Sequence, residues 1–206
     1  MATPRRRYHH GNLKETLIEA ALKLIAELGP AGFTLREVAR RAGVSHNAPY
    51  RHFHDRNDLL ASVAAQGFDH LTESTAHAAA AGRTPLEQLR LAGRGYVAFA
   101  LRWPEHFAAM FDLSLPHAQY PALAAAGDRS FAVLTNLVHA CQASGALKDG
   151  DAQQYALLAW SLVHGIAKLA TGGHPPYSSK KAALEFCDFA TASLTAGIAG
   201  PAVRET

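Results

Sequence analysis

A segment of 21 residues, FTLREVARRAGVSHNAPYRHF at positions 33–53, constrains the fold more than any other part of the chain. Thr34 and Glu37 have the spacing of a capping box, in which each side chain satisfies a backbone N–H at a helix start. Gly43 follows the first helical run and can take the left-handed conformation that ends a helix. Ser45 is a suitable cap for a second helix. The segment predicts two short helices joined by a tight turn, the geometry of a DNA-reading helix-turn-helix.

The predicted second helix, which includes residues 46–52, is rich in groups that can contact DNA. It offers hydrogen-bond donors, an aromatic hydroxyl and cations from one short surface, a composition that is unusual for a buried helix. Pro49 lies about one turn into this helix, where it removes only the first intrahelical hydrogen bond. The small Ala48 beside it leaves the end of the helix slim enough to enter a DNA groove.

Helical spacing of apolar residues, interrupted by Pro and Gly, extends over the rest of the chain, and no segment shows the alternation of a strand. The sequence therefore predicts an all-α fold of about nine helices. Besides the two helices of the motif, the predicted helices span about 12–28, 54–81, 86–103, 104–111, 121–144, 149–171 and 178–199.

The pattern AxxAGVSxxxxYxHF followed by DxxxLL resembles the DNA-binding domain of the tetracycline-repressor (TetR) family. The chain departs from the family at Ala48, where Gly is frequent, at Pro49, where a branched aliphatic residue is frequent, and at Arg56-Asn57, where Lys-Glu is frequent. These departures concern the base contacts more than the fold. The resemblance rests on Ala39, Ala42, Gly43, Val44, Ser45, Tyr50, His52, Phe53, Asp55, Leu59 and Leu60.

The resemblance implies two parts. Residues 1–60 are expected to form a helix-turn-helix DNA-binding domain with a basic N-terminal arm, and residues 61–206 a helical domain for ligand binding and dimerisation. Formal charge agrees with this division: residues 1–60 hold ten Lys and Arg against six Asp and Glu, and residues 61–206 hold ten against eleven. A basic excess confined to the helix-turn-helix segment favours contact with nucleic acid over a random scatter of surface charge.

The basic arm at residues 2–10 has two interpretations. It can follow the phosphates or enter the minor groove of DNA, as basic arms do in other helix-turn-helix proteins. It can equally be a solvated tail, because chain termini are commonly loose. The residues concerned are Arg5, Arg6, Arg7, Tyr8, His9 and His10.

Base contacts are expected from Arg36 and Asn47, with His46 next, because Arg suits guanine and Asn suits adenine. In the family that the chain resembles, phosphate contacts come from the positions of Thr34, Ser45, Tyr50, His52 and Arg56. Each residue has a plainer interpretation as an exposed helix residue, and the rings of Tyr50 and Phe53 can instead pack in the three-helix core. The predicted DNA-contact surface comprises Thr34, Arg36, Ser45, His46, Asn47, Ala48, Tyr50, Arg51, His52 and Arg56.

One small helix-turn-helix buries too little surface for tight specific binding, so two copies on a palindromic operator are expected. The last two predicted helices are more apolar than two terminal helices of a monomer require, and in the TetR family these helices form a four-helix bundle across a dimer. The alternative is that they only complete the monomer core. The apolar residues are Tyr155, Leu158, Ala159, Leu162, Val163, Ile166, Leu169, Leu184, Cys187, Ala190, Leu194 and Ile198.

Two segments, WSLVHG at 160–165 and RWPEHFAAMF at 102–111, resemble a regulatory-domain subclass of this family with a WHG signature. Residues 160 and 164 share a helix face, where an indole and an imidazole can line a mostly apolar pocket. Each of these side chains can also be plain core, as can Phe99 and Phe131. The candidate ligand-binding residues are Trp103, Phe107, Met110, Phe111, Trp160 and His164.

Other functional classes have little support in the sequence. It contains no HExxH or Cys/His zinc pattern, no GxSxG and no glycine-rich phosphate loop after a strand, so no catalysis, metal or cofactor is expected. Cys141 and Cys187 are expected to be buried in a reducing compartment. With no secretory signal and no stretch of 18 apolar residues, a cytoplasmic protein without membrane contact is expected.

The sequence thus predicts a sequence-specific DNA-binding regulator, a repressor that a small, largely apolar ligand releases from its operator. The long predicted helix from Asp55 to Ala81 would couple the two parts, since one end meets the DNA-binding module and the other the pocket. Two alternatives remain: a DNA binder without sequence preference, and a helical carrier or enzyme that does not bind DNA.

Overall fold

The structure of the 206-residue chain is a computed structural model that describes residues 1–206 except 1–12, 176, 178 and 201–206. The predicted all-α fold is confirmed, with eight α-helices in the described residues where about nine helices were expected. No helix in this part of the chain is both long and apolar enough to cross a membrane. The elements are α1 (Leu13–Leu28), α2 (Leu35–Ala42), the 3₁₀ helix η1 (Pro49–Arg51), α3 (Arg56–Ala79), α4 (Pro85–Arg102), α5 (Pro104–Phe111), the 3₁₀ helix η2 (His117–Gln119), α6 (Pro121–Ala143), α7 (Ala152–Thr171) and α8 (Lys180–Gly197).

The predicted capping box and glycine stop both form around α2. The Thr34 backbone N–H donates to Glu37 Oε2 over 2.8 Å, and the Glu37 N–H donates to Thr34 Oγ1 over 3.3 Å. At the other end Gly43 has a φ of 70°, and Val44 N–H reaches back to the Ala39 carbonyl over 3.0 Å. Glycine is favoured at this position because a residue with a Cβ adopts the left-handed conformation only at a steric cost.

The prediction of a second α-helix capped by Ser45 is wrong. An α-helix would bond the residue-49 N–H to the Ser45 carbonyl, but proline has no N–H. That carbonyl instead accepts from Ala48 N–H over 2.9 Å, and the His52 N–H similarly bonds the Pro49 carbonyl over 2.9 Å. These i to i+3 bonds wind the segment more tightly, and only residues 49–51 form a regular helix, of 3₁₀ type.

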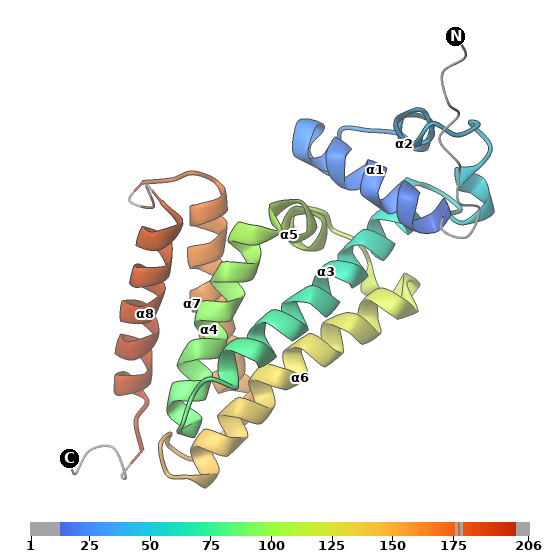
Figure 1. The fold of residues 1–206 in the computed structure, drawn as a ribbon. Coiled ribbons are helices and arrows are strands. Elements are labelled where there is room, and N and C mark those ends of the chain that lie inside the picture. Colours follow the sequence, from blue (N-terminus) through green and yellow to red (C-terminus); the bar gives the residue numbers. More distant parts are fainter. Residues whose placement is uncertain (1–12, 176, 178, 201–206) are drawn as a thin grey trace.

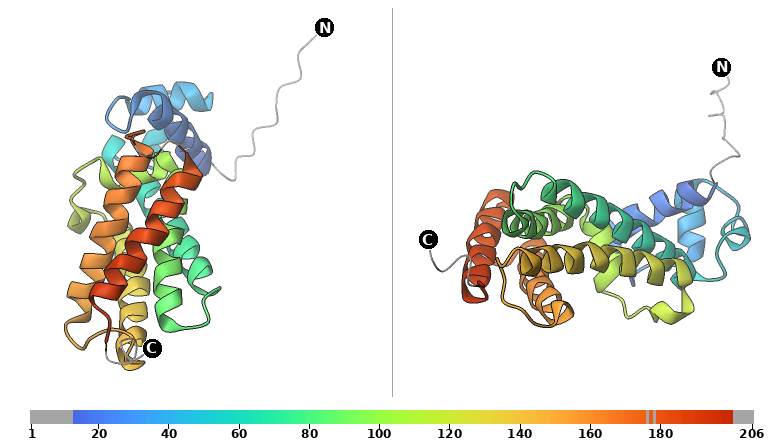
Figure 2. Two further views of the ribbon diagram at one scale, coloured as in Figure 1. Left: turned by 90° about the vertical axis from the view of Figure 1, so that its left-hand side faces the viewer. Right: turned by 90° about the horizontal axis from the view of Figure 1, so that it is seen from below.

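The helices form an elongated molecule with two ends (Figure 1). Helices α1, α2 and η1 lie at one end around the first turns of α3, and α3 continues into the other part. There α3 packs against α4, α5 and α6, and α4 packs against α7 and α8. Figure 2 shows α8 on the outside of this larger part. With 24 residues, α3 spans roughly 36 Å, enough to connect both ends.

Helices α3 and α5 each contribute to two separate hydrophobic cores. In α3, Leu59 and Leu60 belong to the core formed with α1 and α2, whereas Phe68 belongs to the core of the larger part. In α5, Ala109 belongs to the first core and Phe107 to the second. We propose the division into residues 1–60 and 61–206 on this basis, with α3 continuous across it.

Both cysteines are fully buried, as predicted. Burial raises the pKa of the Cys141 thiol to about 11 and that of the Cys187 thiol to about 12. A protonated, enclosed thiol behaves as a small hydrophobic side chain.

Candidate nucleic-acid interface and regulatory cavity

Most of the predicted DNA-contact residues lie at the surface. Tyr50 is 54% exposed, whereas Phe53 is 2% exposed. Phe53 therefore fills the small core, as its alternative interpretation proposed, and the Tyr50 ring remains available. Ala48 and Arg56 are partly buried, and the exposed members of the set are Thr34, Arg36, Ser45, His46, Asn47, Tyr50, Arg51 and His52.

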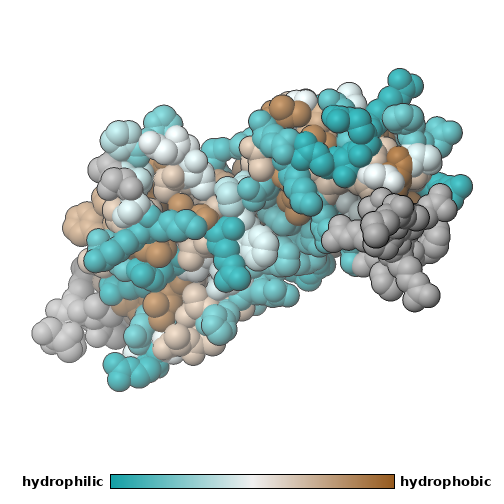
Figure 3. Space-filling view, turned by 45° about the horizontal axis from the view of Figure 1, so that its top comes forward, coloured by the Kyte–Doolittle hydropathy of each residue, from teal (hydrophilic) through white to brown (hydrophobic). Residues whose placement is uncertain are grey.

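Hydrophilic side chains gather over the end of the molecule that holds α1 and α2 (Figure 3). Arg36 projects from α2, which is in contact with η1. Buried Pro49 and Phe53 fix the η1 segment to the core, so the exposed residues between and before them are presented on a supported backbone. A cation and an amide offered from two touching elements have the chemistry to read base edges in a groove.

Three of the charged or polar residues here are held by internal bonds. The Arg56 guanidinium donates from Nη1 to the Ala31 carbonyl over 2.7 Å and so ties the start of α3 to the turn after α1. The Thr34 side chain is occupied by the capping box. Arg41 pairs with Glu27 over 2.6 Å and holds the pKa of that carboxyl below its usual value. The Arg41–Glu27 contact joins residues that are 14 positions apart in the sequence, and no sequence motif predicts it.

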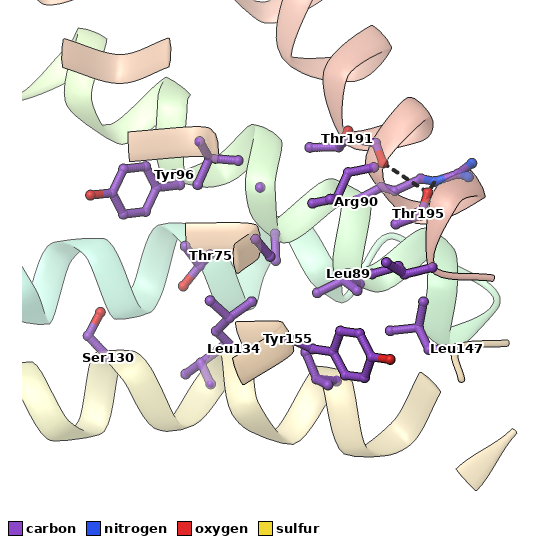
Figure 4. A pocket seen from close by; sticks show the side chains of 18 residues that line it. Thr75, Leu89, Arg90, Tyr96, Ser130, Leu134, Leu147, Tyr155, Thr191 and Thr195 are labelled. Carbon is purple, nitrogen blue, oxygen red and sulfur yellow. Dashed lines mark hydrogen bonds between the residues drawn. The ribbon is translucent and has the colours of Figure 1, made fainter. Parts of the chain in front are cut away.

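A narrow cavity opens in the larger part between α3, α4, α6, α7 and α8 (Figure 4). The cavity has a volume of about 60 Å³. Its walls are mainly aliphatic, with a few hydroxyl groups and one guanidinium. The lining residues include Thr75, Leu89, Arg90, Gly93, Tyr96, Ser130, Leu134, Val138, Leu147, Tyr155, Val163, Thr191, Leu194, Thr195 and Ile198.

A second, more aromatic cavity adjoins the first and has a volume of about 190 Å³. Tyr96, Ser130 and Leu134 line both cavities, so the two share a wall. Of the candidate ligand-binding residues, Phe111 and Trp160 line this second cavity. The remaining lining residues are Phe68, Leu71, Gly127 and Phe131.

The other four candidate ligand-binding residues line neither cavity. Phe107 and Met110 are 2% and 5% exposed and belong to the core of the larger part. Trp103 is 36% exposed and stacks on His70, with the ring centroids 5.1 Å apart. Trp103, Phe107 and Met110 lie on or beside α5, which packs against α1 and α3, and within α5 only Phe111 lines one of these two cavities.

His164 belongs to a polar network behind the cavity wall. The Trp160 indole N–H donates to the Tyr96 hydroxyl oxygen over 3.2 Å, and that hydroxyl lies 2.8 Å from His164 Nδ1. The indole can only donate, so the Tyr96 oxygen accepts from Trp160, whereas the direction of the Tyr96–His164 hydrogen bond is set by the tautomer of His164. Burial lowers the pKa of His164 and raises the pKa of Tyr96, which keeps both groups neutral.

His106 is a second buried histidine, at the contact of α5 with α3. It is 3% exposed, its Nε2 lies 3.3 Å from Gln66 Oε1, and its Nδ1 has no hydrogen-bond partner. Burial, with a smaller contribution from His70, lowers the pKa of His106 to about 4. Within the described residues, no three His, Cys, Asp or Glu side chains lie close enough together to hold a metal ion.

Two family models match the chain. The model described as "Bacterial regulatory proteins, tetR family" matches residues 17–63, which include the helix-turn-helix. The model described as "Tetracyclin repressor-like, C-terminal domain" matches residues 89–194, more than half of the chain. The two matches cover both ends of the molecule.

Curated relatives resemble the chain over a limited stretch. The HTH-type transcriptional repressor Rv3405c of Mycobacterium tuberculosis is 36% identical over 72 residues, 34% of this chain and 36% of the relative. The HTH-type transcriptional regulator BetI of Stenotrophomonas maltophilia is 36% identical over 78 residues, 37% of this chain and 40% of the relative. The chain thus matches well under half the length of these relatives.

Solved structures share the fold over almost the whole chain. A protein with unknown function from Rhodococcus sp. RHA1 is 34% identical, covering 95% of this chain and 100% of its own, with a TM-score of 0.80. The ketosteroid transcriptional regulator KstR2 of Mycobacterium tuberculosis is 18% identical over 92% of this chain and 96% of its own, with a TM-score of 0.68. Together with the two family models, these findings place the chain in the TetR family of DNA-binding transcriptional regulators.

Proposed function

We propose that the protein is a homodimeric repressor that leaves a palindromic operator when a small, largely apolar ligand occupies the cavities between α3, α4, α6 and α7. The single observation that carries the proposal is the shared wall of two apolar cavities in one part of a chain whose other part bears an exposed helix-turn-helix surface. Because its partner is chromosomal DNA, the protein would act in the cytoplasm.

Base readout is assigned to Arg36 and Asn47, with His46 beside them. All three are exposed on or next to the two elements of the motif. Tyr50 and His52 are assigned to phosphates, which fix the register of the protein on the duplex. Ser45 and Arg51 complete this surface, whereas Thr34 and Arg56 contribute first to its support through their internal bonds.

The dimer surface is assigned to α7 and α8. Phe189 is 67% exposed, and large apolar side chains exposed together on two neighbouring helices mark an interaction surface. A second copy is the occupant that explains a palindromic operator, because a two-fold dimer presents two equivalent recognition surfaces. The other exposed apolar residues on these helices are Leu157, Leu158, Leu169 and Phe186.

Coupling between cavity and DNA is assigned to α3 and α5 together. Phe111 lines the second cavity, and Ala109, two residues earlier in α5, packs in the core around α1. A ligand that displaces Phe111 would shift Ala109 with it, because both lie on one short helix. A different spacing of the two DNA-binding modules would then lower operator affinity.

The test is selection from a randomised duplex pool, with the bound sequences recovered and read. A palindrome whose half-sites lie about 10 base pairs apart is expected, since that spacing matches one helical turn. Recovery of duplexes without any shared motif contradicts sequence-specific regulation and supports a non-specific DNA binder.

A further inference from the structure

Arg90 is the one charged side chain among the residues that line the two cavities. It is partly buried on α4, and its Nε donates to Thr195 Oγ1 on α8 over 2.8 Å. In Figure 4 the side chain runs from α4 to α8, so its stem lines the cavity and its guanidinium lies at the rim. The Thr195 bond fixes the guanidinium, while both terminal nitrogens, Nη1 and Nη2, remain without a bonded group among the described residues.

The neighbouring charges of α4 already have partners, in contrast to Arg90. Arg94, one turn later on the same side of α4, forms an ion pair with Asp188 of α8. Glu87, one turn earlier, contacts the backbone N–H and the side chain of Arg83. Within the described chain, no carboxylate lies within 4.0 Å of Arg90. An anion that reaches this guanidinium would supply a counterion that no described residue provides.

Two adjoining cavities with mainly apolar walls lie beside Arg90. On α6 the cavity walls extend from Val138 in the first cavity to Gly127 in the second, roughly 16 Å along the helix axis. Beyond Tyr96 and Ser130, at the shared wall, the lining is mostly aromatic, with Leu71 and Gly127 between the rings. A charged group would be poorly accommodated there, whereas a hydrocarbon chain would be favourably buried.

We propose that the effector is a long-chain carboxylate, whose head group binds the Arg90 guanidinium at the α4–α8 rim and whose chain occupies the two cavities. A guanidinium with both Nη atoms free presents the planar fork that a carboxylate accepts in bidentate fashion. This inference rests on the proposed regulatory function, because it names the ligand class of the same cavities.

The test compares binding of dodecanoate with binding of dodecanol, which has the same chain and no charge. Trp160 lines the second cavity and reports binding by its fluorescence, in a Trp103→Phe background that removes the other indole. Dodecanoate is expected to bind about 10-fold or more tightly than dodecanol, as a charge-assisted bidentate contact implies.

Arg90→Gln should weaken dodecanoate binding by about 10-fold or more and change dodecanol binding by less than about 3-fold. Arg94→Gln is the matched control, since it removes a cation from the same seam that lines neither cavity, and it should change neither affinity. Circular dichroism and a thermal midpoint confirm that each variant folds. If Arg90→Gln does not fold, Arg90→Lys and the acid-to-alcohol ratio of the parent protein decide the question.

Equal affinity for acid and alcohol, or full dodecanoate affinity in folded Arg90→Gln, overturns the inference. Operator affinity measured with dodecanoate separates the two proposals. Arg90-dependent binding that leaves operator affinity unchanged supports the ligand class and contradicts the proposed release mechanism. Operator release by dodecanol that persists in Arg90→Gln supports the release mechanism and overturns the carboxylate assignment.

Discussion

The two ends of the molecule differ in how they use their hydrophobic residues. Around α1 and α2, large side chains such as Leu17 and Phe53 are at most 2% exposed, and hydrophilic side chains gather over this end, with Leu28 exposed among them. In the larger part, apolar residues line two cavities and also remain exposed on α7 and α8, where Phe189 is an example. We propose that the smaller end supports a DNA-contact surface, and that the larger end provides the ligand cavities and the dimer contact.

Truncating a side chain in the tightly packed smaller core should lower the free energy of unfolding more than truncating one in a cavity wall. This is the largest effect that we expect. Phe53→Ala should lower the free energy of unfolding by about 3–5 kcal/mol, because it leaves a void in a tightly packed site. Phe131→Ala, at a partly buried wall that already adjoins open space, should cost less than half as much. Urea unfolding followed by circular dichroism measures both, and equal losses would remove the distinction between the two cores.

The two ends also differ in dimerisation, which we assign to the exposed apolar residues of α7 and α8. Phe189→Glu should weaken dimerisation by about 2 kcal/mol or more, because it places a charge in a buried dimer contact. Leu28→Glu is the matched control: Leu28 is 51% exposed at the DNA-binding end, and a charge there should leave the dimer intact. Sedimentation equilibrium measures both, and a dimer that survives Phe189→Glu would exclude this face as the interface.

Sequence readout should depend only on the smaller end. Asn47→Ala should weaken operator binding by about 1–3 kcal/mol and relax the preference at one base pair. Asn57→Ala removes the same group from an exposed position outside the predicted surface. Fluorescence anisotropy on the selected operator should show no comparable loss for Asn57→Ala. Equal losses for both variants would mean that Asn47 does not read bases.

Acid should weaken the contact where the two ends meet. The pKa of His106 falls from 6.5 to about 4 in the folded protein, so the unfolded chain takes up this proton first. The neutral ring stabilises the fold above pH 6.5, and this contribution is lost as the pH falls toward 4. The loss should approach about 3 kcal/mol once the pH has fallen to 4, because each pKa unit of difference corresponds to about 1.4 kcal/mol. His106→Gln should show a smaller decline of the unfolding free energy across that window, and an identical decline would contradict the assignment.

Local signals predicted the structure well where one chain segment determines it. Thr34, Glu37 and Gly43 set the bounds of α2 through bonds within a few residues. Helices α4, α5 and α6 begin at Pro85, Pro104 and Pro121, each within one residue of the predicted start. At Pro49 the same reasoning underestimated the effect of the missing N–H. Without this donor, the expected α-helical turn is replaced by a turn with 3₁₀ hydrogen bonds.

The cavity was predicted less completely because it is produced by packing between distant segments. Leu89, Leu134 and Val163 come from three helices, and each has the apolar spacing of an ordinary core residue. The resemblance of two segments to one regulatory-domain subclass grouped Phe111 and Trp160 with Phe107 and Met110, although only the first two line a cavity. No sequence pattern marked Arg90 as a cavity residue, since its environment depends on the packing of α8 against α4.

The central claim is that occupancy of the cavities changes operator affinity, and a substitution can test it without any ligand. Ser130 lines both cavities, so Ser130→Leu would fill the space between them. Ala125→Leu adds a similar side chain at an exposed position of the same helix. The measurement is operator affinity of both variants by fluorescence anisotropy. We expect Ser130→Leu to bind at least about 5-fold more weakly than Ala125→Leu, within the range typical of allosteric coupling. Equal affinities for two folded dimers would contradict the link between the two ends.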